Sequence, residues 1–217
     1  MSQTKHEFSA SLRLEVFSRY LLYLPEDHSE RSDWPLIVFL HGSGERGDDL
    51  TLVEKHGLPR LLGAGLRLPA VVISPQCPAG QLWTPQLPAI KALVDDAVAS
   101  RGVDPTRIVA TGLSLGGAGA YELVSRYPGT FAGVAPICGP WTSLFVTDES
   151  ASLPTWVFHG DADDVVPLSD SEDLVRAIEA KGGSPRFTVY PGVGHNSWDA
   201  AYGDPELLEW LVEQRRA

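Results

Sequence analysis

Residues 112–116 read Gly-Leu-Ser-Leu-Gly and follow directly on the apolar run at 107–110. Between a strand and a helix, a G-x-S-x-G sequence forms a sharp turn that exposes the serine hydroxyl above the edge of a sheet. The helix that follows points its first amides and the positive end of its dipole toward the same place. The structural alternative is a glycine-rich turn with an incidental N-capping serine. We expect Ser114 to be a nucleophile, because the turn has both the composition and the setting for one.

A serine hydroxyl is a weak nucleophile at neutral pH and needs a base that a third group orients. His195 is the candidate base, because it lies in a glycine-flanked loop, PGVGHNSW, directly after the apolar run at 186–190. His41 and His159 end apolar runs, where a ring that packs against or hydrogen-bonds neighbouring loops is the more usual role. The other three of the six histidines lie in polar or helical stretches. An exposed loop histidine without a function is the alternative for His195.

Three aspartates are candidates for the orienting acid. Asp161, Asp163 and Asp164 all follow the apolar run that ends at position 160. Each gives the chain order Ser, Asp, His that one class of serine hydrolases uses. Spacing alone does not choose among the three.

The elements that must position these residues alternate between strand and helix. Continuous apolar runs at 35–42, 69–75, 106–112, 131–138, 154–160 and 186–192 predict six buried strands. Helix-like stretches are found at roughly 50–63, 88–101, 116–127, 169–181 and 204–215. The two alternating segments at 12–17 and 19–25 predict an antiparallel pair at one edge. The sequence therefore predicts an α/β fold with a mostly parallel, twisted sheet of about eight strands, helices on both faces, and its reactive groups at the carboxyl ends of the strands.

Composition narrows the class of protein. We expect one domain over residues 1–217, and the net charge of −11 disfavours nucleic acid and anionic membranes as partners. No run of about 18 apolar residues is present, and the first residues lack the basic start and apolar core of a signal peptide, so we expect a cytoplasmic protein. Cys77 and Cys138 have neither a disulfide framework nor zinc-site spacing, and we interpret both as buried core residues. No metal or cofactor is expected.

The motifs together resemble a known superfamily. LHGSGERG at 40–47, SPQCP at 74–78, GLSLGG at 112–117, HGDADDVVP at 159–167 and GVGHNSW at 192–198 are similar to segments of α/β-hydrolases. Within that superfamily the chain resembles small carboxylesterases, dienelactone hydrolases and polyhydroxybutyrate-depolymerase-like esterases. The resemblance implies a triad of Ser114, Asp163 and His195, with Asp163 identified by the HG-x-x-D-x-x-V-P pattern. It also implies an oxyanion hole formed by the backbone amides of Ser43 and Leu115, although HGSG departs from the HGGG of many lipases.

The expected reaction is hydrolysis of a carboxylic ester through an acyl-enzyme on Ser114. No insertion between the buried strands is long enough for a large lid domain, so short or soluble small-molecule esters fit better than long-chain lipids. Trp83, Trp141 and Trp198 follow strand ends and either line a substrate pocket or pack the loops. A peptidase or thioesterase with the same triad, and a non-catalytic binding protein of the same fold, remain alternatives. The oligomeric state is not predicted.

Other patterns in the same loops have weaker interpretations. Residues 42–47 satisfy G-x-G-x-x-G, but charged side chains occupy the turn and no helix opens immediately, which disfavours nicotinamide binding. Asp161, Asp163 and Glu172 match three positions of a calcium loop whose turn glycine is absent. For Glu45 and Arg46 we expect an ion pair that stiffens the loop, with binding of a polar substrate end as the alternative.

Overall fold

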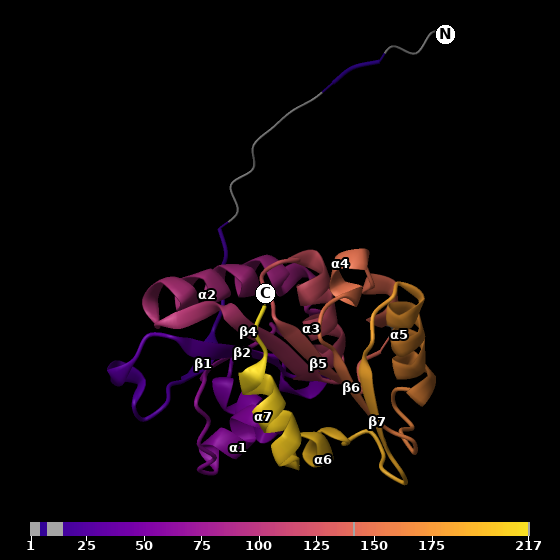
Figure 1. The fold of residues 1–217 in the computed structure, drawn as a ribbon. Coiled ribbons are helices and arrows are strands. Elements are labelled where there is room, and N and C mark those ends of the chain that lie inside the picture. Colours follow the sequence, from indigo (N-terminus) through magenta and orange to yellow (C-terminus); the bar gives the residue numbers. More distant parts are fainter. Residues whose placement is uncertain (1–4, 8–14, 141, 217) are drawn as a thin grey trace.

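The computed structural model describes residues 5–7, 15–140 and 142–216. They form one seven-stranded sheet in the order β1-β3-β2-β4-β5-β6-β7, with helices on both sides (Figure 1). The strands are β1 (Tyr20–Tyr23), β2 (Trp34–Leu40), β3 (Val71–Pro75), β4 (Val103–Leu113), β5 (Gly133–Ile137), β6 (Trp156–Gly160) and β7 (Arg186–Tyr190). Every neighbouring pair is parallel except β1 with β3. All six predicted strands are present and the predicted fold class is confirmed, but β7 is not buried as expected, because it lies at the edge of the sheet.

Helices cover the two faces of the sheet in separate groups. They are α1 (Gly57–Gly63), α2 (Leu87–Ser100), α3 (Leu115–Arg126), α4 (Asp148–Ala151), α5 (Leu168–Ala180), α6 (Trp198–Gly203) and α7 (Pro205–Glu213). The apolar side chains of α2, α3, α4 and α5 pack on one face, and those of α1, α6 and α7 pack on the other. Three layers result, with the sheet in the middle.

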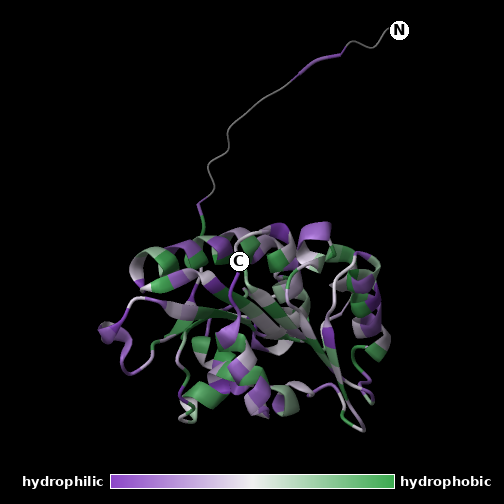
Figure 2. Cartoon of the chain, viewed as in Figure 1, coloured by the Kyte–Doolittle hydropathy of each residue, from purple (hydrophilic) through white to green (hydrophobic). Residues whose placement is uncertain are grey.

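Alternation along the central strand β2 explains why its whole run is apolar. Leu36, Val38 and Leu40 point into the core under α2 and α3, whereas Ile37 and Phe39 point into the core under α1 and α7. A strand buried on both faces has no solvent side, so it reads as a continuous hydrophobic run. Figure 2 shows this distribution, with hydrophobic residues on the strands and polar residues on the outer helix surfaces. None of the helices in the described residues combines the length and apolar composition that a bilayer-crossing helix needs.

The expected opening pair of strands is wrong. β1 pairs antiparallel with β3, where Tyr20 lies opposite Pro75. Residues 15–19 contain no strand, and residues 12–14 lie outside the described part of the chain. In the described residues the sheet has seven strands. β1 is its edge strand, and the partner of β1 comes from a distant part of the sequence.

Candidate active site

The Ser114 turn joins the end of β4 to the start of α3. Ser114 has φ 52° and ψ −122°, a positive φ that is strained for a residue with a side chain. The turn is held from both sides by close backbone contacts. A Cβ on Gly112 would lie 2.3 Å from the carbonyl oxygen of Gly116, and one on Gly116 would lie 1.9 Å from that of Leu40. Only glycine fits at these two positions, which explains the composition of the turn.

Loops after three strands bring Ser114, His195 and Asp163 into one hydrogen-bonded chain. The Oγ of Ser114, after β4, lies 2.9 Å from the Nε2 of His195, after β7. The Nδ1 of His195 lies 2.7 Å from the Oδ2 of Asp163, which follows β6. Since a carboxylate only accepts, Nδ1 carries the proton and Nε2 is free to accept from the serine hydroxyl. The His195 side chain is 18% exposed and the Asp163 side chain is fully buried.

Asp163 is surrounded by hydrogen-bond donors. Its Oδ1 accepts from the backbone amides of Val165 and Val166, both at 2.9 Å, and its Oδ2 accepts from His195. Burial raises the pKa of the Asp163 carboxyl, but the hydrogen bonds from His195, Val166 and Val165 together outweigh burial and lower it below its usual value. The group is therefore ionised at neutral pH and holds His195 in one tautomer.

His159 lies on the other side of the same carboxylate. Its Nε2 is 3.2 Å from the Oδ2 of Asp163 and 3.0 Å from the carbonyl oxygen of Val166, and both side chains are fully buried. Its Nδ1 is 2.7 Å from the hydroxyl of Ser171 on α5. Because the Val166 carbonyl only accepts, Nε2 carries the proton and Nδ1 accepts from Ser171. From its sequence position we expected only packing or hydrogen bonding to loops. Its spacing of four residues before Asp163 was the signal for this contact.

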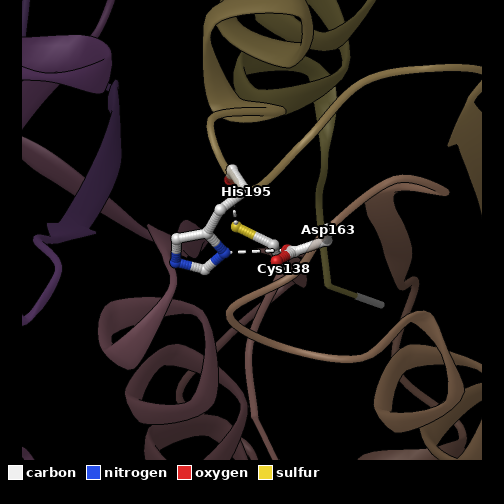
Figure 3. A group of neighbouring side chains, drawn as sticks. All are labelled: Cys138, Asp163 and His195. Atoms are coloured by element: carbon white, nitrogen blue, oxygen red, sulfur yellow. Dashed lines mark hydrogen bonds and ion pairs between the residues drawn. The ribbon is translucent and has the colours of Figure 1, made fainter.

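Cys138 supports the loop that carries His195. Its Sγ donates to the carbonyl oxygen of His195 at 3.4 Å, and its backbone has φ 42°. Burial raises the pKa of this thiol to about 12. Its sulfur, an Asp163 oxygen and a His195 nitrogen lie within 4.8 Å of one another, a potential set of metal ligands (Figure 3). Nδ1 of His195 already donates to Asp163 and the thiol keeps its proton, so the cluster is satisfied by hydrogen bonds.

The amides expected to form an oxyanion hole both begin helical segments. Ser43 begins the 3-10 turn Ser43–Glu45, and Leu115 begins α3. The first amides of a helix have no partner within it, so both are suited to bind an anion. A Cβ on Gly42 would lie only 3.6 Å from the Cβ of Ser114. The Gly42 loop and the Ser114 turn therefore border the same small space.

With this geometry described, comparison with known proteins places the chain in a family. The model of the dienelactone hydrolase family matches residues 79–200. The chain belongs to this family. A solved structure of a thermostable esterase is 33% identical, with a TM-score of 0.77 over 91% of this chain and 59% of that one.

Curated relatives of this dienelactone hydrolase family member include probable carboxylesterases and one named as inactive. A probable carboxylesterase of Oryza sativa subsp. japonica is 28% identical over 193 residues, 75% of this chain and 82% of the relative. A probable inactive carboxylesterase of the same organism is 31% identical over 113 residues, 50% of this chain and 46% of the relative. The chain thus spans less than half of that second relative.

The expected ion pair between Glu45 and Arg46 is wrong. Arg46 donates to the carbonyl oxygens of Ser43 at 2.8 Å and Gln81 at 3.0 Å. Among the described residues no ion pair joins it to Glu45. Glu45 is buried, and its carboxylate oxygens lie 3.9 Å from His41 Nδ1 and from His56 Nε2. Arg46 therefore fixes the loop through backbone oxygens, which a sequence pattern does not reveal.

The three candidate pocket tryptophans of this dienelactone hydrolase family member have different positions. Trp83 is buried, donates from its indole nitrogen to the carbonyl oxygen of His41 at 3.0 Å, and lines an apolar cavity next to Leu115. Trp198 begins α6, with its ring 5.2 Å from that of His195 in an edge-on arrangement. Trp141 lies outside the described residues. Trp83 and Trp198 thus stand on opposite sides of the serine turn.

Proposed function

We propose that this member of the dienelactone hydrolase family is a serine carboxylesterase that cleaves short or soluble esters. The hydrogen-bonded chain from Ser114 through His195 to Asp163 carries the proposal. It supplies a nucleophile, a base within proton-transfer distance and a buried anion that stabilises the protonated base. Membership of the family alone is insufficient, since one relative is named as inactive.

In the proposed reaction, the Ser114 hydroxyl attacks the ester carbonyl and its proton moves to Nε2 of His195. The backbone amides of Ser43 and Leu115 stabilise the oxyanion, each contributing about 3 kcal/mol to lowering the barrier. The imidazolium, stabilised by Asp163, then gives its proton to the departing alcohol. Water attacks the acyl-enzyme, with His195 again accepting the proton, and releases the acid and free Ser114.

The test is turnover of p-nitrophenyl acetate by wild type and Ser114→Ala, with labelling of the wild type by a fluorophosphonate probe. We expect the substitution to lower kcat by about 10⁴-fold or more and to abolish labelling. Ser100→Ala, at the exposed end of α2, is the matched control. Undiminished turnover by Ser114→Ala refutes the proposal. Faster cleavage of a thioester or peptide than of the matched ester favours the alternative activities.

A further inference from the structure

One face of α3 leads away from Ser114 along an apolar cavity. Leu115, Ala118, Gly119 and Glu122 are spaced at i, i+3, i+4 and i+7, so they share a helix face, and all four line the cavity. The cavity has a volume of about 320 Å³, at the small end of the range for ligand sites. Its lining includes Leu115, the residue that directly follows Ser114 in the chain.

Beside this helix face, the wall of the cavity is aromatic and rigid. Trp83 packs directly on the helix, since a Cβ on Gly119 would meet its side chain at 2.7–2.8 Å. The Trp83 indole is fixed by its hydrogen bond to the His41 carbonyl oxygen. Phe145, at the end of the 3-10 turn Thr142–Phe145, and Pro140 complete the wall. A flat or extended apolar group therefore fits in the cavity alongside the contact between α3 and Trp83, against Pro140 and Phe145.

A buried carboxylate lies at the far end of the cavity. With a rise of 1.5 Å per residue, Glu122 is about 10 Å along the helix from Leu115. Its Oε2 accepts from the hydroxyl of Thr84 at 2.7 Å, and both residues line the cavity. Its Oε1 lies 3.9 Å from the guanidinium of Arg126, beyond hydrogen-bond distance. A carboxylate accepts about four hydrogen bonds, so Glu122 has capacity for another donor.

The acyl group and the alcohol of a bound ester lie on different sides of Ser114. The leaving alcohol must lie near His195, which gives it a proton, and His195 contacts Trp198 on the α6 side of the sheet. The cavity lies on the α3 side, where Trp83 and Leu115 belong to the other core. The acyl group, which stays attached to Ser114, therefore points toward the cavity.

We propose that this cavity, called the acyl groove below, binds the acyl group of the substrate. The preferred substrates carry a hydroxyl at the distal end of an apolar acyl group about 10 Å long. The hydroxyl donates to Glu122. An unsubstituted chain of that length places a methyl group against the carboxylate and removes water from it without a replacement hydrogen bond. The inference rests on the proposed esterase function, because it assigns the acyl side of that reaction.

The experiment compares kcat/KM for p-nitrophenyl acetate, octanoate and 8-hydroxyoctanoate. We expect wild type to prefer 8-hydroxyoctanoate over octanoate by about fivefold, and Glu122→Gln, which keeps the side chain's size, to reduce this preference, because a neutral amide oxygen is a weaker acceptor than a carboxylate. Ala118→Leu fills the middle of the groove with a good helix former and is expected to lower the octanoate-to-acetate ratio at least tenfold. Ala92→Leu, at an exposed position of α2, is the matched control and keeps both ratios.

The outcomes separate the two proposals. Acetate turnover together with unchanged ratios in folded Ala118→Leu and Glu122→Gln overturns the groove assignment and leaves the esterase intact. The groove assignment is also overturned if kcat/KM of these variants changes only when the alcohol part of the ester is varied, and not when the acyl part is varied. If wild type neither turns over acetate nor reacts with the fluorophosphonate probe, the esterase function fails. Calorimetry then tests the groove by itself, and equal affinity of wild type and Ala118→Leu for the neutral amide 8-hydroxyoctanamide overturns it.

Discussion

At the scale of single residues, we expect His159 to affect the reaction through Asp163. The Nε2 of His159 lies 3.2 Å from the Oδ2 of Asp163. His159 is a positioning residue, because it does not reach Ser114 or a substrate. His159→Leu removes the N–H beside the carboxylate while keeping an apolar side chain of similar size. We expect kcat to fall about tenfold, because the Asp163 carboxylate loses a polar neighbour that helps to hold it toward His195.

His159→Gln provides the rescue for this prediction. The glutamine amide places an N–H near the position of Nε2, so it can donate to the Val166 carbonyl oxygen as the imidazole does and keep a polar group beside Asp163. The measurement is kcat/KM against pH for p-nitrophenyl acetate in all three proteins. Equal kcat/KM values for the Leu and Gln variants would mean that His159 acts only by filling space.

The two cysteines are expected to be inert in the native protein. Burial raises the pKa of Cys77 to about 11 and that of Cys138 to about 12, so neither forms the reactive thiolate at neutral pH. Iodoacetamide at pH 7 should leave esterase activity intact and label neither thiol until the protein is denatured, as mass spectrometry can show. Rapid labelling of Cys138 in step with loss of activity would place a thiol in the chemistry.

The sequence could predict which residue types form the site and their order in the chain, but not the directions of their side chains and of the neighbouring backbone amides. Ser114 and His195 follow from a motif and a loop position. Asp163 required a family resemblance, because its two neighbours at 161 and 164 have nearly the same spacing. The choice is made by the amides of Val165 and Val166, whose direction depends on how the loop turns.

At the scale of elements, the apolar runs correctly predicted where the strands lie along the chain. They did not predict which strand pairs with β1, because its partner is distant in sequence. β1 is an edge strand whose partner β3 is some 50 residues away, so no local pattern reveals it. Two short helices, α4 and α6, were also missed. The first is set by a reciprocal cap between Thr147 and Ser150, and such local hydrogen bonds leave little periodicity to detect.

The contact between α3 and β2 gives an element-scale prediction. A Cβ on Gly116 would meet the Leu40 carbonyl at 1.9 Å, and a backbone group cannot swing away as a side chain can. We expect Gly116→Ala to destabilise the fold by about 3 kcal/mol, measured from urea denaturation midpoints. Gly63→Ala is the control, because Gly63 ends α1 with open space around it. A change there within about 0.5 kcal/mol is expected, and equal effects in both variants would contradict the steric argument.

At the scale of the whole molecule, the parallel sheet brings residues that are far apart in sequence close together at one edge. Parallel strands all present their carboxyl ends on the same side, so loops after β4, β6 and β7 meet although Ser114 and His195 are 81 positions apart. The strand order was not predictable from composition, but any order that keeps these three strands close together in the sheet allows their loops to meet. The order β4-β5-β6-β7 does so with one intervening strand.

Acid stability is a whole-molecule property that His41 is expected to dominate near pH 6. The ring is buried, its Nδ1 donates to the Gly42 carbonyl at 2.6 Å, and its Nε2 accepts from the Cys77 amide at 3.0 Å. Burial lowers its pKa from 6.5 to about 4, with a smaller contribution from Arg46, whereas the Gly42 hydrogen bond opposes the shift. Glu45, 3.9 Å away, is the facing carboxylate.

Between pH 6.5 and 4 the unfolded chain binds a proton at position 41 that the native protein does not bind, so stability must fall as pH falls through this window. From pH 7 to 5 this one residue should remove about 2 kcal/mol. Urea denaturation at each pH measures the slope, and His41→Gln should flatten it whatever its stability at pH 7, while Ala92→Leu keeps the wild-type slope. A slope that His41→Gln leaves unchanged would place the acid sensitivity in other groups, because only titration at position 41 is removed by that substitution.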